Sequence, residues 1–257
     1  MADLHDMVDV DLRSFDRVYR EYEGDRLTMR EDLVGTFTGR LQKVADWTPV
    51  VLDRGKVVGF MMGCPTDRGP ADFTTWEDMT DNGTLNSTFS ATGRNTYIVS
   101  LSMLASHSSS PARSMLIATH LGLLIRGGTD LAFFESRMPG LRSWAKAQCR
   151  KRGINLDELS DEETNILAET YFGLTRTVNG KTGPHDRLLR IYQEAGAKHL
   201  KLIPNAYQDH PSMDYGVLTA FTNPLPPWAR RNPVIRQVLG RFILLAAKSP
   251  MIAKLIF

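Results

Sequence analysis

The spacing of hydrophobic and polar positions predicts two helices at the start of the chain. Between Val10 and Tyr22 large apolar residues recur every three or four positions, and the same spacing returns between Met29 and Val44. This spacing places the apolar side chains on one face of each helix. We therefore expect two amphipathic helices before the first strand.

Patterns typical of strands follow. The segment "TPVVLDRGKVVGFMMGC" has two β-branched runs on either side of Asp-Arg-Gly-Lys, which indicates a hairpin. Residues 65–95 are polar and rich in turn residues, so we expect a long loop there. A strand over Thr96–Ala105, a helix over Ala112–Arg126 and a buried strand ending at "MPG" come next.

The second half of the chain is more polar. Residues 141–180 are predicted to be a helical insertion, with a capping box that starts at Ser160, and a short helix ending at Gly196 leads to two last strands. From Asn223 onward there is no Asp or Glu, and several apolar residues share one helical face: Val234, Ile235, Val238, Leu239, Phe242 and Ile243. The predicted domains are thus residues 1–224 and a basic amphipathic tail, residues 225–257.

Composition narrows the class of protein. The chain has 257 residues, 42% of them hydrophobic and 23% charged, which is typical of a globular protein and excludes wholesale disorder. A net charge of +2 gives no argument for a nucleic-acid partner. The two cysteines, Cys64 and Cys149, lack metal-ligand spacing, so we expect no metal and a reducing cytoplasmic location. Neither a secretion signal nor an apolar run of about 20 residues is evident.

The predicted order of elements resembles the GNAT superfamily of N-acyltransferases. The motifs "TTWEDMTDNGT", "ESRMPG", "RLLRIYQEAGAK" and "PNAYQDHPSMDYGVLTAFTNP" are similar to the GNAT domain that is fused to nitrilase-type carbon–nitrogen hydrolases. The resemblance covers about residues 9–224 and implies an α/β (α+β) fold, in which helices flank a central mixed, twisted sheet. The insertion would precede the last helix-strand-strand unit, and the strand that normally opens this fold is not evident before Val8.

The resemblance implies an acyl-coenzyme A site at the start of the central helix. In that family the pyrophosphate lies on a Gln/Arg-x-x-Gly-x-Gly/Ala loop, and the pattern falls here on the six residues from His107 to Ala112. Only Ala112 keeps it, and Pro111 also removes an N–H donor. The residues implied in donor binding are Leu101, Ser102, Met103, Leu104, His107, Ser108, Ser109, Ser110, Ala112, Arg113 and Ser114.

Two interpretations of this loop are open. It is either an altered phosphate cradle or an ordinary helix start, with Ser110 as N-cap and Pro111 as the first helical residue. In the first case the donor is acyl-coenzyme A or the phosphopantetheine arm of an acyl carrier protein, which needs less of the cradle.

Catalytic roles are also implied by the resemblance. Tyr192 stands four residues before Gly196, the family spacing for the acid that protonates the leaving thiolate, although neighbouring leucines also fit a core role. Glu135 interrupts an apolar strand and is the candidate base, because burial makes a carboxylate a stronger base; pairing with Arg137 is the alternative. His107 is a second candidate base.

The acceptor site is expected to use the long loop and the last strand, through Trp76, Glu77, Asp78 and Tyr215. The acceptor would be a small amine, an amino acid or a peptide side chain in specialised biosynthesis. Flexible apolar residues favour an acyl group longer than acetyl, although ordinary core packing is the alternative: Met61, Met62, Met103, Leu104, Met115 and Met138. The tail fits a membrane surface, a homodimer contact or the protein's own surface. The rival to an enzyme is a non-catalytic GNAT-like module that binds acyl-coenzyme A or a partner protein.

Overall fold

The computed structural model describes residues 2–19, 26–108, 111–206, 208–249 and 251–252. The chain divides into two compact units, one made of residues 1–133 and 222–257 and the other of residues 134–221. In the described part of the chain six strands form one hydrogen-bonded sheet, in the order β1 (Val50–Asp53), β2 (Lys56–Thr66), β3 (Asn95–Met103), β4 (Leu131–Arg137), β8 (Gly216–Thr222) and β7 (Lys198–Ile203), and β4 contributes residues to both units.

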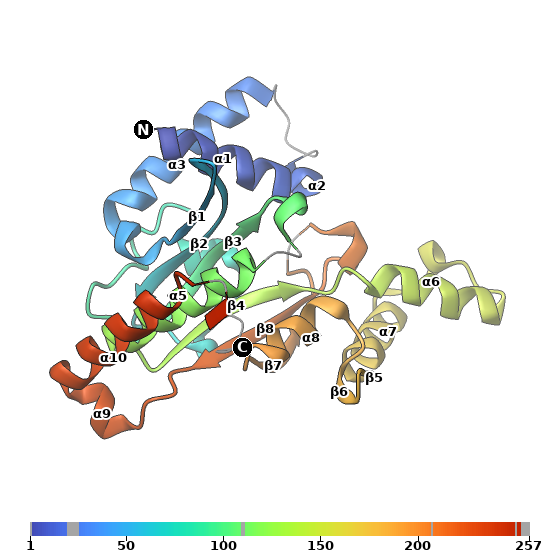
Figure 1. The fold of residues 1–257 in the computed structure, drawn as a ribbon. Coiled ribbons are helices and arrows are strands. Elements are labelled where there is room, and N and C mark those ends of the chain that lie inside the picture. The colour runs from blue at the N-terminus through green and yellow to red at the C-terminus, as the bar shows by residue number, and fades with distance from the viewer. Residues whose placement is uncertain (1, 20–25, 109–110, 207, 250, 253–257) are drawn as a thin grey trace. The chain divides into compact units, whose positions relative to one another are not determined.

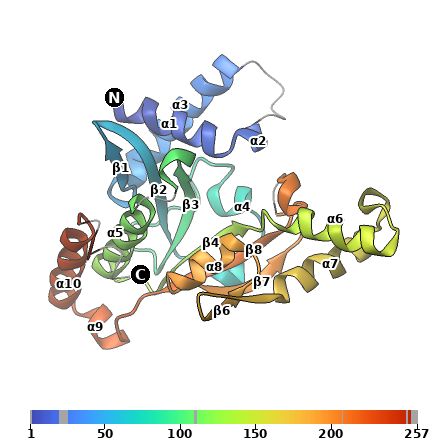
Figure 2. The ribbon, with the colours of Figure 1, turned by 45° about the vertical axis from the view of Figure 1, so that its right-hand side comes forward.

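Three helices open the first unit: α1 (Ala2–Ser14), α2 (Asp16–Tyr19) and α3 (Arg26–Val44). The second expected helix, Met29–Val44, is confirmed by α3. The first, Val10–Tyr22, is confirmed in part, because α1 begins at Ala2 and ends at Ser14, α2 ends at Tyr19, and residues 20–22 lie outside the described residues. The buried face of α1 carries Met7, Val8 and Val10, because these positions recur at helical spacing. Figure 2 shows α1 and α3 together over the strands of this unit.

The sheet of the first unit starts with the expected hairpin. Strands β1 (Val50–Asp53) and β2 (Lys56–Thr66) are antiparallel, and both turn residues, Arg54 and Gly55, have positive φ, as a type I′ turn requires. Strand β3 (Asn95–Met103) pairs antiparallel with β2, and β4 (Leu131–Arg137) pairs parallel with β3. The sheet is therefore mixed.

Helices cover both faces of this part of the sheet. Phe60 of β2 packs edge-on against Phe37 of α3, whereas Gly63 of the same strand faces His120 of α5 (Ala112–Gly127). Positions 60 and 63 point to opposite faces of a strand. Consequently α3 and α5 lie on opposite faces, and the expected mixed α/β class with a flanked central sheet is confirmed.

Other expectations for this unit hold in part. The segment predicted as a long loop is mostly irregular but contains the short helix α4 (Trp76–Thr80). Helix α5 ends at a left-handed Gly128, as its Gly-Gly pair predicts. The tail forms α9 (Pro227–Arg231) and α10 (Pro233–Ala246), and α10 lies alongside α5 (Figure 1). The predicted boundary at residue 224 stays a prediction.

The second unit holds α6 (Leu141–Arg152), α7 (Asp161–Gly173), α8 (Arg187–Glu194), β7 (Lys198–Ile203) and β8 (Gly216–Thr222). Its core includes Met138, Leu141, Leu189 and Val217. Ser160 caps α7 in the predicted capping box. The hairpin of β5 (Thr175–Val178) and β6 (Lys181–Pro184) was not predicted, although its Asn-Gly turn is a strong sequence signal.

Candidate functional site

A bulge in β3 determines which side chains of this strand face each helix layer. Met62 of β2 pairs with Ser100, and the next residue, Gly63, pairs with Ile98, so Val99 is an extra residue in β3. Before the bulge, Thr96 points toward Gly63 and α5. After it, residues of the same even numbering point to the opposite face, because one inserted residue reverses the alternation.

The reversed face brings two serines onto a buried carboxylate of α1. Ser102 Oγ donates to Asp11 Oδ1 at 2.6 Å and Ser100 Oγ at 3.1 Å, while the Tyr19 hydroxyl donates to Oδ2 at 2.7 Å. Asp11 is 4% exposed. Burial, and then the negative charge of Asp11, raises the pKa of Tyr19 well above its ordinary value. This cluster was not predicted from the sequence, where its signal is an Asp at an apolar position of the α1 pattern.

A buried arginine links this cluster to the long loop. Burial lowers the pKa of Arg40, and the charge of Asp11 opposes that shift. The Arg40 guanidinium lies 5.3 Å from the ring centre of Phe37 and 5.6 Å from that of Trp76, and its Nε donates to Gly83 O. Arg40 therefore makes cation–π contacts with both aromatic rings.

The residues predicted to recognise the acceptor in this loop differ in their environment. The Trp76 indole N–H donates to the carbonyl of the bulge residue Val99 at 3.1 Å, so Trp76 is fixed against β3. Glu77 and Asp78 are exposed, and Asp78 forms an ion pair with Arg68 at 3.4 Å. Of the three, Trp76 is the one that the structure holds at the strand.

The backbone of residues 101–104 was predicted to hold the thioester carbonyl. Leu104 N donates to Val58 O of β2, and Met103 N donates to Ser14 Oγ of α1 at 3.1 Å. In an antiparallel pair, successive N–H groups of one strand point alternately toward the partner strand and away from it. Since the Leu104 N–H points to β2, the Ser102 N–H also points to β2 and the Leu101 N–H points away from it. Leu101 is accordingly the best placed of the four to donate to a bound group.

The loop before α5 is only partly described, since Ser109 and Ser110 lie outside the described residues. His107 Nε2 lies 3.3 Å from Asp53 Oδ2, at the end of β1, and Ser108 Oγ donates to Ala105 O. Helix α5 begins at Ala112 with Pro111 as its N-cap residue. The interpretation of the loop as an ordinary helix start placed Pro111 as the first helical residue. The helix begins one residue later, at Ala112.

Arg113 and Ser114, also predicted to bind the donor, are half-buried in the first turn of α5. Segment 101–117 contains no acidic residue. Its composition and the positive end of the helix are compatible with a phosphate.

The two predicted catalytic residues belong to the second unit and lie on opposite faces of β4. Tyr192 of α8 is 8% exposed, and its ring meets the Phe134 ring edge-on, with centroids 4.9 Å apart. Glu135, the next residue of β4, lies against Gly216 of β8, where an added Cβ would come within 2.6 Å of its Oε1. Adjacent residues of a strand point to opposite faces. The acid and base roles stay predictions.

Two other expectations for this unit concern Arg137 and Tyr215. Arg137, the alternative partner of Glu135, forms an ion pair with Asp209 at 3.1 Å. Tyr215 is 7% exposed and packs in the core with Leu189, and burial is the main cause that raises its pKa. This environment fits a packing role, and substrate binding by Tyr215 stays a prediction.

Four of the methionines that were expected to favour a longer acyl chain pack against other side chains, and the length of the acyl chain stays a prediction. Met61 and Met62 are buried in the first unit, and Met138 is buried in the second. Met115 packs against the small cluster of Ala118 and Ala247. Within the described part of the chain, no group of three or more His, Cys, Asp or Glu side chains is arranged to hold a metal ion.

Comparisons with known proteins establish the fold. No family model and no curated protein matches the chain. Among solved structures, it is similar to the loading GNATL domain of CurA from Lyngbya majuscula, with 16% identity, a TM-score of 0.61 and coverage of 86% of this chain and 93% of that one. It is also similar to the GNAT-like decarboxylase GphF in complex with isobutyryl-CoA, with 17% identity, a TM-score of 0.58 and coverage of 86% and 95%.

These two likenesses confirm the expected GNAT fold. At such identities they carry the fold and leave the reaction open. The closer resemblance to GNAT domains fused to nitrilase-type hydrolases stays a prediction.

Proposed function

We propose that this chain is an N-acyltransferase. Its donor is an acyl thioester of coenzyme A or of a carrier protein's phosphopantetheine arm, and its acceptor is an amine of a small molecule, amino acid or peptide side chain. The fold shared with a GNAT-like protein in complex with isobutyryl-CoA supports a thioester donor. The observation that carries the proposal is the bulge at Val99, beyond which the Leu101 N–H is directed away from β2.

Such a backbone donor suits the developing charge of acyl transfer. When an amine attacks the thioester carbon, the carbonyl oxygen becomes an oxyanion, and an N–H fixed in a sheet stabilises it without reorganisation. The side chain of residue 101 is not needed for this, so the rest of the segment is free to differ from the family pattern.

The opposite placement of Glu135 and Tyr192 on β4 supports separate roles for them. In the proposed reaction Glu135 removes a proton from the acceptor ammonium, the nitrogen attacks, and a carbon–nitrogen bond forms. The carbon–sulfur bond then breaks, and Tyr192 gives its proton to the departing thiolate. The nitrogen loses a second proton, which restores the Tyr192 phenol through solvent, and the products are an amide and a free thiol; the proton held by Glu135 is released to solvent.

The donor-binding residues in this proposal are those of segment 101–114. The α5 N-terminus with Arg113 and Ser114 would hold a phosphate. His107 contacts Asp53, which leaves it less able to serve as the first residue of a pyrophosphate cradle. A donor with one phosphate, on a carrier protein, is therefore as compatible with the loop as coenzyme A. A medium or long acyl chain and a role in specialised biosynthesis remain part of the proposal.

The test is release of free thiol from acyl-coenzyme A and acyl-carrier-protein donors, with a panel of amines. Tyr192→Phe should lower turnover by about 100-fold or more, the usual contribution of a general acid, while donor binding is kept. Tyr171→Phe, which also removes a buried hydroxyl, is the matched control and should change turnover by less than about threefold. Unchanged turnover in Tyr192→Phe would remove it as the acid. No thiol release from any donor would favour the non-catalytic module.

Decarboxylation is a second candidate, favoured by the likeness to a GNAT-like decarboxylase. Loss of carbon dioxide from a malonyl-type thioester leaves an enolate, whose oxygen needs the same kind of N–H donor as an oxyanion. A proton then adds to carbon, and the thioester stays intact. Release of labelled carbon dioxide from carboxyl-labelled malonyl-coenzyme A without free thiol would support this reaction over transfer to an amine.

A further inference from the structure

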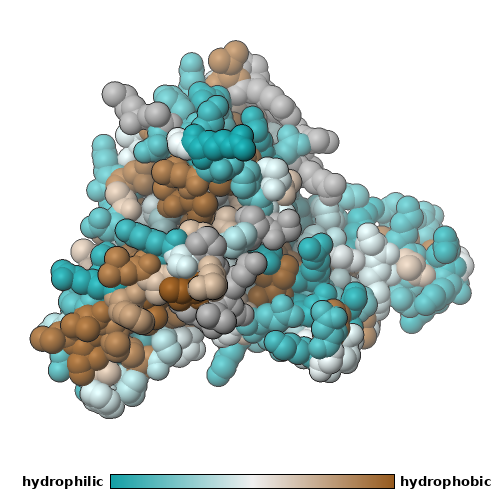
Figure 3. Space-filling model, in the orientation of Figure 1, coloured by the Kyte–Doolittle hydropathy of each residue, from teal (hydrophilic) through white to brown (hydrophobic). Residues whose placement is uncertain are grey.

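One face of α10 exposes large apolar side chains to solvent. Val234, Val238, Phe242 and Leu245 recur at helical spacing and are 61–68% exposed, and we call them the α10 apolar face. Trp228 of the preceding helix is also 68% exposed. Figure 3 shows hydrophobic surface gathered over α9 and α10. Contiguous apolar surface of this kind marks an interaction site more often than an ordinary surface.

The opposite face of α10 is already occupied by packing against α5. A Cβ added at Gly122 would lie 2.9 Å from Leu244 Cγ, and one added at Gly240 would lie 2.7 Å from Arg126 Cβ. The two helices thus approach closely at a glycine on each side. Because α10 packs on α5 through its other face, the exposed side chains of the α10 apolar face are not needed to attach the helix to the protein.

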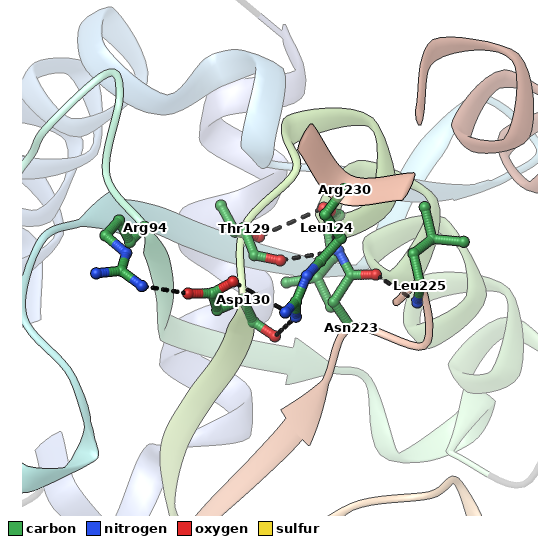
Figure 4. A network of polar contacts seen from close by, with 7 residues as sticks. All are labelled: Arg94, Leu124, Thr129, Asp130, Asn223, Leu225 and Arg230. Atoms are coloured by element: carbon green, nitrogen blue, oxygen red, sulfur yellow. Dashed lines mark hydrogen bonds and ion pairs between the residues drawn. The ribbon is translucent and has the colours of Figure 1, made fainter. Parts of the chain in front are cut away.

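Polar contacts at the start of the tail hold it against the first unit (Figure 4). Asn223 Nδ2 donates to the carbonyls of Leu124 and Thr129, at 3.2 and 2.8 Å. Arg230 forms an ion pair with Asp130 at 3.4 Å, and Asp130 also pairs with Arg94. The tail is therefore a built part of the first unit, and the α10 apolar face is presented in one orientation.

The positive charge of the tail indicates which kind of partner the α10 apolar face would bind. Residues 223–257 include Arg230, Arg231, Arg236, Arg241, Lys248 and Lys254, and no acidic residue. Arg231, Arg241 and Lys248 are exposed. A second copy bound through the same face would bring two tails of like charge together, which is unfavourable. An anionic lipid surface offers both the apolar interior and the opposite charge.

We propose that the α10 apolar face docks on an anionic lipid bilayer surface, with the helix lying in the interface. Helix α10 has 14 residues, fewer than the roughly 20 that a span needs. Among the described residues, no helix is long and apolar enough to cross a membrane. The proposal is independent of the acyltransferase activity, since none of the residues placed in the reaction belongs to this face.

Vesicle binding by the full chain tests it. We expect binding to phosphatidylcholine vesicles that contain phosphatidylserine, weaker binding at high salt, and little binding to phosphatidylcholine alone. Val238→Ser with Phe242→Ser should weaken binding by about 100-fold or more, because two large apolar side chains are lost from the contact. Arg231→Gln with Arg241→Gln should weaken it by about 30-fold, from about fivefold per charge.

Matched variants in the second unit are the controls. Ile154→Ser with Ile166→Ser removes two apolar side chains that are 44% and 55% exposed, and Arg150→Gln with Lys151→Gln removes two exposed charges of α6. Both controls should bind vesicles as the unchanged protein does. The substituted residues are exposed, so circular dichroism should show the same fold throughout.

Several results would overturn the proposal. Equal binding to neutral and anionic vesicles would show that charge does not select the partner. If the control substitutions in the second unit weakened vesicle binding as much as the tail substitutions do, α10 would not be the contact. No vesicle binding, together with self-association that the Val238 and Phe242 substitutions abolish, would assign the face to a second copy instead.

Discussion

Acid should weaken the protein through one buried histidine. His120 of α5 is 3% exposed, and its ring faces Gly63, where an added Cβ would lie 2.5 Å from Cε1. Within the described part of the chain neither ring nitrogen has a hydrogen-bond partner. Burial lowers the pKa of His120 from 6.5 to about 4, because the charged ring loses its hydration.

The sign and size of the effect follow from this shift. The unfolded chain binds a proton at His120 near pH 6.5, whereas the folded protein binds it only near pH 4, so acid favours unfolding between these values. The contribution of neutral His120 to the free energy of unfolding is fully present above pH 6.5, the pKa in the unfolded chain. It is lost as the pH falls toward about 4, the pKa in the folded protein. A difference of about 2.5 pKa units corresponds to about 3 kcal/mol.

Urea unfolding at several pH values between about 7.5 and 4.5 measures this loss. Other groups also titrate in acid, so the informative quantity is the difference between the unchanged protein and His120→Leu. We expect the variant to keep about 2–3 kcal/mol more of its stability across this range. At neutral pH the free energy of unfolding of His120→Leu should be equal to that of the unchanged protein or about 1 kcal/mol higher, since a buried N–H without a partner is removed.

His5→Gln is the control, because His5 is exposed on α1 and should leave the pH dependence unchanged. If the unchanged protein and His120→Leu lost stability in parallel, His120 would not be a buried neutral histidine, and this reasoning would fail.

Three other predictions concern the carboxylate cluster and two close packing contacts. Asp11→Ala should lower the free energy of unfolding by about 3–5 kcal/mol in urea titration, because three hydroxyl donors lose their acceptor, while Asp11→Asn should cost less. Gly216→Ala should displace the Glu135 side chain and lower turnover by about tenfold or more with a smaller change in melting temperature; equal turnover would argue against Glu135 as the base. Gly122→Ala should cost about 1–3 kcal/mol in thermal unfolding through contact with Leu244, and an unchanged melting temperature would contradict the packing of α10 on α5.

Local signals predicted most elements of the fold. The turn at Arg54 and Gly55 joins two β-branched runs, Ser160 starts a capping box, and Gly128 ends α5, and each signal acts within a few residues. The hairpin at Asn179 and Gly180 had an equally local signal that sequence analysis overlooked.

The bulge and the Asp11 cluster were harder to predict, because each depends on residues far apart in the chain. In the sequence "NTYIVSLSM" positions 97, 99, 101 and 103 are all apolar, as in a plain strand, and the extra residue appears only when β3 is paired with β2. Asp11 looked like one of several acids in an amphipathic helix. Its burial follows from Ser100 and Ser102, which are 89 and 91 residues away along the chain.

Family resemblance supplied candidate roles that spacing alone would not have given. It singled out Tyr192 and Glu135, and the structure adds that they lie on opposite faces of β4. It also pointed to the loop at His107, where the contact with Asp53 could not be foreseen from the sequence.

The measurement that tests the central claim most directly is the melting temperature of the full chain with acyl-coenzyme A thioesters of increasing chain length, and with acyl-phosphopantetheine. A donor present at about 100 times its dissociation constant stabilises the folded protein by about 2.7 kcal/mol. For a protein of this size that raises the melting temperature by about 5–10 °C. We predict such a shift with at least one thioester and none with the free carboxylic acid. No shift with any thioester, in a protein that melts cooperatively without ligand, would contradict the proposal that this chain binds an acyl thioester donor.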